Sequence, residues 1–288
     1  MRIKNILFGY FFLAILSGIV LAIWRTVMIV RYYDPYSNEY AIEAETSLRS
    51  FGFVLLFVFL ALLTSAILLR KFEFDGFSAS ENQFSVFTSS LLGFVFLAVG
   101  IFVFFYLNNF TEIFAYPLYQ CTQILTHLLV FLCAAYFILH AAGNARFENA
   151  KKMLALSTPI WSVAFLIWSY LDPTYNYRDY DHSLCLFAIS ALAFFLLYDA
   201  GMAVTGKSTA PYFVFSLISL VASTVYVIPN FILMAYWELS SNVNRIFEAV
   251  LLATIFYTCA CLRNLCLSVK VREKTEKKKK TKKETVAQ

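Results

Sequence analysis

The chain has 288 residues, of which 60% are hydrophobic, 18% aromatic and 14% charged, and its formal net charge is +5. A soluble domain usually carries about 45–50% apolar and about 25% charged residues. This composition excludes a soluble globular enzyme, a disordered protein and a fibrous repeat, and it indicates an integral membrane protein with several spans.

Apolar stretches long enough to cross a bilayer recur along the chain. A hydrocarbon core of about 30 Å needs roughly 20 apolar residues in a helix. Eight stretches meet this length, at residues 6–30, 50–69, 84–107, 118–140, 154–171, 184–204, 211–235 and 246–268. The fifth is the weakest, because it is short and contains Pro159. We therefore predict an all-α bundle of eight transmembrane helices over residues 1–268 and a basic cytoplasmic tail over residues 269–288.

The basic residues between the stretches predict how the bundle is oriented. Lys and Arg concentrate in cytoplasmic loops. With eight spans, 18 of the 23 Lys and Arg residues fall on one side, and the other side carries mainly Asp and Glu. Both termini are therefore expected in the cytoplasm. A cleaved signal peptide would instead leave seven spans, but the apolar run from Ile6 to Trp24 is longer than the usual signal core of about 7–15 residues.

Two similar segments follow the first and the fifth stretch. One begins with Tyr33-Asp34-Pro35 and the other with Leu171-Asp172-Pro173, and both continue with Tyr and Asn residues. Four spans separate them, so the chain can contain a parallel repeat of four plus four helices, as some transporters do. The alternative is that Asp-Pro commonly stops a helix and starts a turn, with Tyr favoured at the membrane interface.

Polar side chains inside the apolar stretches are the candidates for a ligand site, because such groups are costly in a membrane. The candidates share the outer half of the predicted bundle and are Arg25, Gln120, Gln123, His127, Asn230, Arg245 and Glu248. Gln120, Gln123 and His127 lie within about 60° of one another around a helix. Pro229 precedes Asn230 and frees a backbone carbonyl, which can bind a ligand or a neighbouring helix. Together they indicate an outward-facing pocket for a small polar solute.

Each of these residues also has a structural interpretation. The glutamines and His127 can form interhelical hydrogen bonds that fix packing. Arg25 can extend to the interface, and Arg245 can pair with Glu248 at a spacing of three residues. The inner half of the predicted bundle is poorer in polar groups, and Asp199 is expected at the interface. A second function therefore stays open, that of a non-transporting membrane sensor, assembly factor or partner subunit.

Sequence motifs for catalysis are absent from the chain. It contains no H-E-x-x-H zinc motif, no Walker A loop and no G-x-S-x-G nucleophile turn. The six cysteines lie in or at the ends of the stretches and are typical of small packing residues, not of a disulfide framework. We therefore expect no enzymatic activity, no metal and no cofactor.

The C-terminal segment accounts for the net charge. From Arg263 to the end it carries ten basic and three acidic residues, so the rest of the chain is slightly acidic. We expect it to extend the last helix into the cytoplasm. Its basic cluster consists of Lys277, Lys278, Lys279, Lys280, Lys282 and Lys283. Such a cluster predicts contact with anionic lipid headgroups, and no aromatic side chain is interleaved to stack on nucleic-acid bases.

Three short segments resemble polytopic membrane proteins of Gram-positive anaerobic bacteria that have no characterised activity. The segments are Trp24-Arg25 at the end of the first stretch, Tyr33-Asp34-Pro35 just outside it, and Phe84-Ser85-Val86-Phe87-Thr88-Ser89-Ser90 at the start of the third. The resemblance implies a multi-pass protein of a bacterial cell membrane, and it implies no particular activity.

Overall fold

The computed structural model describes residues 2–34, 39–69, 72–74, 82–106, 117–172, 180–206, 209–237 and 243–271. The α-helices in these ranges are α1 (Arg2–Tyr32), α2 (Glu45–Leu69), α3 (Gln83–Tyr106), α4 (Pro117–Ala142), α5 (Glu148–Ala155), α6 (Ser157–Tyr170), α7 (Tyr180–Thr205), α8 (Ala210–Trp237) and α9 (Val243–Ser268). The short strands are β1 (Tyr33–Asp34), β2 (Glu39–Tyr40), β3 (Phe72–Phe74) and β4 (Val269–Val271). Short 3-10 helices at Ile42–Ala44 and Ala145–Phe147 precede α2 and α5.

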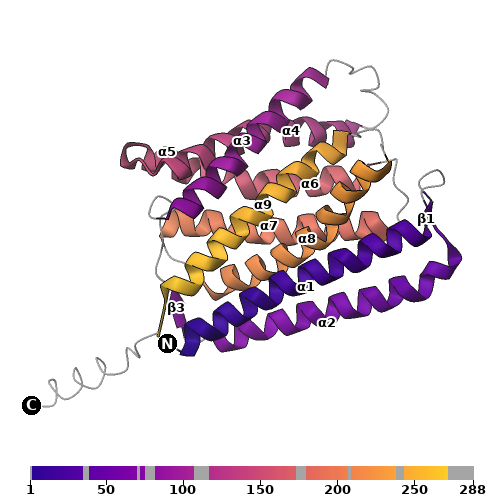
Figure 1. Ribbon diagram of the computed structural model, residues 1–288. Coiled ribbons are helices and arrows are strands. Elements are labelled where there is room, and N and C mark those ends of the chain that lie inside the picture. Colours follow the sequence, from indigo (N-terminus) through magenta and orange to yellow (C-terminus); the bar gives the residue numbers. More distant parts are fainter. Residues whose placement is uncertain are drawn as a thin grey trace, which may run out of the picture.

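Eight segments within the described residues are helical, apolar and long enough to cross a membrane. They match the eight stretches expected from the sequence, with α5 and α6 together forming the fifth. The predicted all-α bundle is therefore confirmed, and the chain is a polytopic membrane protein. α1 packs along α8 within this bundle (Figure 1).

The fifth span is broken near the start of the predicted stretch 154–171, which covers the end of α5 and all of α6. α5 ends at Ala155, Leu156 forms a turn, and α6 begins at Ser157. Pro159 has no N–H to bond back to the carbonyl of Ala155. The Thr158 hydroxyl donates to that carbonyl instead, at 2.9 Å. The membrane-embedded α6 is consequently only 14 residues long.

The helices gather around α8, the most deeply buried of the spans. α8 contacts α1, α2, α7 and α9, while α3, α4 and α6 pack in succession on the far side of the bundle (Figure 1). α3 and α4 approach closely at Gly93, where a Cβ atom would lie 2.8 Å from Cγ1 and 3.1 Å from the backbone nitrogen of Ile138. Small residues at such crossings are typical of membrane helices, because van der Waals packing holds those helices together.

Both ends of the described chain lie at one end of the bundle. Lys4 Nζ donates to the carbonyl of Leu267 at 2.6 Å, so the start of α1 meets the end of α9. β3, which follows α2, pairs antiparallel with β4, which follows α9. We name this the terminal end, and the opposite end, where β1 pairs with β2, the hairpin end. The arrangement agrees with an even number of crossings, and the cytoplasmic location of the terminal end stays a prediction.

The last helix is shorter than expected. α9 ends at Ser268 and the chain continues as strand β4, so the predicted helical extension beyond Ser268 is wrong for residues 269–271. Residues 277–283 of the basic cluster lie outside the described residues. Residues 35–38 and 173–179 also lie outside them, so the four-plus-four repeat stays a prediction.

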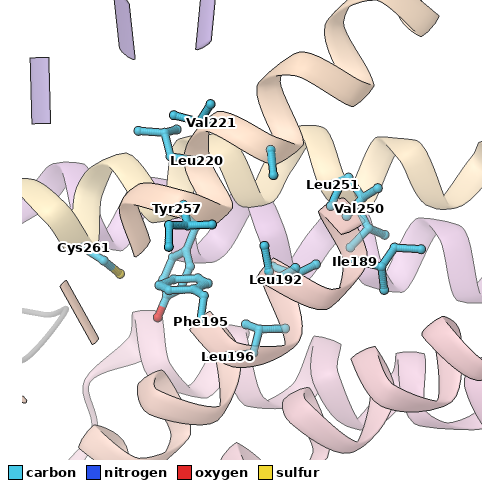
Figure 2. Close-up of a cluster of buried hydrophobic side chains, with 14 of the residues drawn as sticks. Ile189, Leu192, Phe195, Leu196, Leu220, Val221, Val250, Leu251, Tyr257 and Cys261 are labelled. Carbon is cyan, nitrogen blue, oxygen red and sulfur yellow. The ribbon is translucent and has the colours of Figure 1, made fainter. Parts of the chain in front are cut away.

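The centre of the bundle, between its two ends, is an apolar section built from α7, α8 and α9. Figure 2 shows its side chains, all buried. They include Ile189, Leu192, Phe195 and Leu196 of α7, Leu220 and Val221 of α8, and Val250 and Leu251 of α9. No charged side chain is among the residues labelled there, and the buried polar residues in the middle of α8 and α9 include the neutral Ser219, Ser223 and Thr254.

Candidate functional site

Arg25 occupies the core of the bundle near the hairpin end, not the interface. Its side chain is 1% exposed. Nη1 donates to the backbone carbonyls of Val225 at 3.0 Å and Tyr226 at 2.6 Å in α8. Val225 is the residue whose carbonyl Pro229 leaves free, because proline has no N–H to bond four residues back. The freed carbonyl expected from the sequence is thus used by a neighbouring helix.

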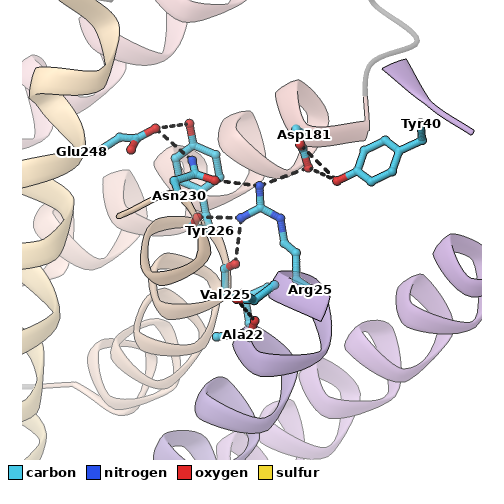
Figure 3. Close-up of polar contacts among 9 residues, drawn as sticks. Ala22, Arg25, Tyr40, Asp181, Val225, Tyr226, Asn230 and Glu248 are labelled. Carbon is cyan, nitrogen blue, oxygen red and sulfur yellow. Dashed lines mark hydrogen bonds and ion pairs between the residues drawn. The ribbon is translucent and has the colours of Figure 1, made fainter. Parts of the chain in front are cut away.

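Nη2 of Arg25 binds two further side chains. It donates to Oδ1 of Asp181 at 3.1 Å and to Oδ1 of Asn230 at 3.0 Å. The guanidinium carbon also lies 5.5 Å from the ring centre of Tyr226, within cation–π distance. Arg25 therefore connects α1 to α7 and α8, as Figure 3 shows.

Asn230 joins the cation to a second carboxylate. Its Oδ1 faces Arg25, while its Nδ2 donates to Oε1 of Glu248 at 2.9 Å. The Tyr226 hydroxyl donates to the same Glu248 oxygen at 3.1 Å. Glu248 comes from α9 and is buried. The amide thus places its oxygen toward the positive charge and its nitrogen toward the negative one.

Asp181 and Tyr40 form the side of the network nearest to water. Asp181 opens α7, and its side chain is 22% exposed, whereas that of Arg25 is 1% exposed. The hydroxyl of Tyr40 in β2 donates to both carboxylate oxygens of Asp181, at 3.1 and 3.2 Å. Burial and the neighbouring Asp181 carboxylate raise the pKa of Tyr40 well above its usual range. Tyr40 therefore stays a hydrogen-bond donor at any physiological pH.

We refer to Arg25, Tyr40, Asp181, Tyr226, Asn230 and Glu248 as the Arg25 network. It brings together three of the residues expected from the sequence, Arg25, Asn230 and Glu248, with three that the sequence did not indicate. With Arg25 charged and both carboxylates ionised, the network carries a net charge of −1. Charges held away from water persist only when they are paired and hydrogen-bonded, and this network provides both for Arg25.

The polar face expected on the fourth span does not form an outward-open site at His127. The His127 imidazole is 5% exposed and packs edge-on to Trp168 and face-to-face with Phe247, with ring centres 5.2 and 5.7 Å away. Neither ring nitrogen has a hydrogen-bond partner among the described residues. The prediction that His127 faces an outer cavity is therefore wrong, because helical spacing says which residues share a face but not what covers it.

The remaining candidates, Gln120, Gln123 and Arg245, form no described contact with the Arg25 network. Gln120 and Gln123 are half-buried on α4, and none of the bonds of the Arg25 network described above comes from that helix. The side chain of Arg245 lies outside the described part of the structure, so its pairing with Glu248 stays a prediction.

Replacing His127 with Phe is expected to stabilise the protein. A buried polar group without a partner costs about 1–3 kcal/mol, and a phenyl ring preserves the contacts with Trp168 and Phe247. The midpoint of thermal unfolding of the full chain in detergent micelles should rise for H127F. A lower midpoint would mean that the imidazole has a polar partner that this packing does not account for.

A second polar cluster lies toward the terminal end, where the sequence predicted few polar groups. Asp199 of α7 is 1% exposed, so its expected place at the membrane interface is wrong. Its carboxylate accepts from the hydroxyls of Tyr212 at 2.6 Å, Tyr257 at 3.1 and 3.2 Å, and Tyr136 at 3.4 Å. These tyrosines come from α8, α9 and α4 and are themselves buried.

The two clusters occupy opposite ends of the same three helices. Asp181 and Asp199 are 18 residues apart on α7, which corresponds to about 27 Å along the helix axis. The apolar section of Figure 2 lies between them. Within the described residues, no group of three or more His, Cys, Asp or Glu side chains is arranged to hold a metal ion.

Comparison with protein-family models, with curated protein sequences and with solved structures finds no significant match to this chain.

Proposed function

We propose that the protein binds a small polar solute at the Arg25 network and carries it across the membrane. The observation that supports this is that one cation and two carboxylates from α1, α7 and α9 are joined in one network. Arg25 bonds to Asp181 and to Asn230 of α8, and Asn230 and Tyr226 of α8 bond to Glu248. Ionisable groups within spans are costly, rare and usually functional. The network is also more exposed at Asp181 than at Arg25, which agrees with a site that a solute enters from one end.

The chemistry of the network favours a solute that carries both charges. The planar guanidinium of Arg25 is suited to bind a carboxylate. In this structure its Nη2 is already bonded to the Asp181 carboxylate and to the Asn230 oxygen. Glu248 presents an acceptor that suits an ammonium group, and the Asn230 nitrogen occupies it here. A zwitterion such as an α-amino acid could replace both internal partners at once. We therefore infer that the structure is a closed state, in which the network substitutes for the solute.

The proposal is tested with the full chain in lipid nanodiscs. The probes are a panel of α-amino acids and betaines, with acetate and ethylammonium as matched solutes of one charge each. A zwitterion at 100 times its dissociation constant stabilises the folded state by about 2.7 kcal/mol, and a corresponding rise in the thermal midpoint is expected. Glu248→Gln keeps an acceptor for Asn230 but removes the charge, so it should abolish the rise. A flat response to the whole panel would contradict this solute class.

The second candidate is a membrane component that transports nothing. It is favoured by the four internal hydrogen bonds of Arg25, which fasten α1 to α7 and α8. Proteoliposome uptake of the solute that raises the midpoint separates the two candidates. Uptake that Glu248→Gln removes supports a carrier, and binding without uptake supports a sensor or a partner subunit. In either case we propose a cell-membrane location, with the basic cluster against anionic lipid at the cytoplasmic face.

A further inference from the structure

Asp199, Tyr136, Tyr212 and Tyr257 form the Asp199 cluster, which has the features of a second binding site for a small ligand. Four helices supply it, and the three tyrosine hydroxyls all point toward one carboxylate at 2.6–3.4 Å. In Figure 2 the hydroxyl of Tyr257 lies beside Phe195, at the edge of the apolar section and on the side of Cys261. None of these groups belongs to the Arg25 network, and the proposed solute does not use them.

Among the described residues, no positively charged side chain is found to act on Asp199. The polar groups that face it are Tyr136 from α4, Tyr212 from α8, and Tyr257 and Cys261 from α9. Its hydrogen-bond partners among the described residues are the three hydroxyls, which are neutral donors. A buried carboxylate that is hydrogen-bonded but has no cationic partner pays a desolvation cost that neutral donors offset only in part.

A cation bound at this carboxylate would neutralise its charge. The distances between the carboxylate oxygens and the tyrosine hydroxyls indicate which cation fits. A sodium ion would have to lie between the oxygens and separate them. Here the carboxylate and the hydroxyls are in direct hydrogen-bond contact, and Asp199 is 1% exposed. A proton needs no such space. We propose that Asp199 is a proton-binding site, in which the proton joins one carboxylate oxygen. One tyrosine hydroxyl then reorients to accept from that O–H, while the others continue to donate to the carboxyl group.

His140 supplies a titratable group between this site and the terminal end. It lies one helical turn beyond Tyr136 on α4, with the two rings 5.5 Å apart between centres. The imidazole is 7% exposed, and its Nδ1 has no hydrogen-bond partner among the residues that the structure describes. Lys151 and Glu148 of α5, which pair with each other at 2.5 Å, are the charged residues that act on it. A proton entering from the terminal end therefore meets His140 before Tyr136 and Asp199.

The proton site goes beyond the proposed function, because proton binding at Asp199 does not depend on any solute at the Arg25 network. The two sites share α7, α8 and α9 and are separated by the apolar section. If the Arg25 network binds no solute, the proton site is unaffected. If it does bind one, the shared helices provide the means for the proton and the solute to influence each other.

Infrared difference spectroscopy of the full chain in lipid vesicles tests the site. The expected result is a protonated-carboxyl carbonyl band that disappears as the pH is raised, shifts in D₂O, and is lost in Asp199→Asn. An asparagine at this position still accepts from tyrosine hydroxyls through its Oδ1, and its Nδ2 can donate to the hydroxyl of Tyr136 once that hydroxyl reorients, so the shape of the cluster is preserved. Asp181→Asn, at the other end of the same helix, is the matched control and should retain the band. Glu248→Gln should retain it as well.

Three results would overturn the proposal. They are the absence of any band specific to Asp199 at every pH, the retention of the wild-type band in Asp199→Asn, and the loss of the band on adding Na⁺ at constant pH. Should Asp199→Asn fail to fold, Tyr212→Phe keeps the carboxyl group and removes its shortest hydrogen bond. That variant should move the pH midpoint of the band by about one unit, since a hydrogen bond to a charged group contributes roughly that much. Tyr10→Phe should leave the midpoint unchanged, because the Tyr10 hydroxyl bonds to the exposed Thr64 and to no other residue that the structure describes.

Discussion

Replacing Arg25 with Met is expected to lower the free energy of unfolding by about 3–5 kcal/mol, because it leaves buried partners without their cation. Two backbone carbonyls, the Asp181 carboxylate and the Asn230 amide each lose a donor in the same substitution. Denaturation of the full chain by SDS in mixed micelles, followed by tryptophan fluorescence, measures the change. Arg25→Lys should be intermediate, since an ammonium group keeps the charge but cannot reproduce the planar fork.

The control for Arg25 is Arg49, which also pairs with a carboxylate. Arg49 binds Glu45 at 2.6 Å, but the two side chains are 73% and 62% exposed. Ion pairs in this setting contribute less than about 1 kcal/mol, so Arg49→Met should leave the unfolding midpoint almost unchanged. Equal losses for the two variants would mean that Arg25 acts by its charge alone and that the buried network contributes nothing.

Replacing Asn230 with Leu is expected to lower the free energy of unfolding by about 2–4 kcal/mol. The Asn230 amide bonds to Arg25 through its oxygen and to Glu248 through its nitrogen, so both charged groups lose a hydrogen bond at once. Hydrogen bonds to charged groups contribute about 1.5–3 kcal/mol each, and relaxation of the neighbours recovers part of the sum. The same SDS titration measures the loss.

Ser223→Ala provides the comparison for Asn230 within α8. The Ser223 hydroxyl is buried and has no hydrogen-bond partner among the described residues. Its removal should change the free energy of unfolding by less than about 0.5 kcal/mol or raise it slightly. A loss as large as that of Asn230→Leu would indicate that any polar change in this part of α8 is disruptive, and the bridging role of Asn230 would then be wrong.

The spans could be predicted from the sequence because hydropathy is a local property of each stretch. The break between α5 and α6 could not, since it depends on how Thr158 takes over the carbonyl that Pro159 leaves. The extension of α9 beyond Ser268 was predicted wrongly, because the strand that follows Ser268 requires β3, which lies almost 200 residues earlier in the chain.

The sequence predicted those residues of the candidate site that lie inside apolar helices and missed those that lie at the ends of elements. Arg25 and Glu248 were found because charged residues stand out within apolar helices. Asp181 and Tyr40 were missed because they lie at the ends of elements, where polar residues are ordinary. Their contacts join residues 156 and 141 positions apart, which no local pattern reveals.

The terminal end was misjudged for a related reason. Asp199 lies six residues before the end of α7, a place from which a side chain can often reach the interface. Tyrosines near the ends of spans are common at the membrane interface, so the sequence does not show that the hydroxyls of these three point inward. Only the packing of four helices brings them to one carboxylate.

The pairing of α1 with α8 also has a consequence for biosynthesis. Arg25 is 205 residues ahead of Asn230 and 156 residues ahead of Asp181. At roughly 5–20 residues per second, the ribosome supplies these partners about 10–40 s after Arg25 has been made. During that interval the nascent first helix holds an uncompensated guanidinium, which must remain near the headgroups. The first span can therefore reach its final depth only after α8, which carries Asn230, has been made.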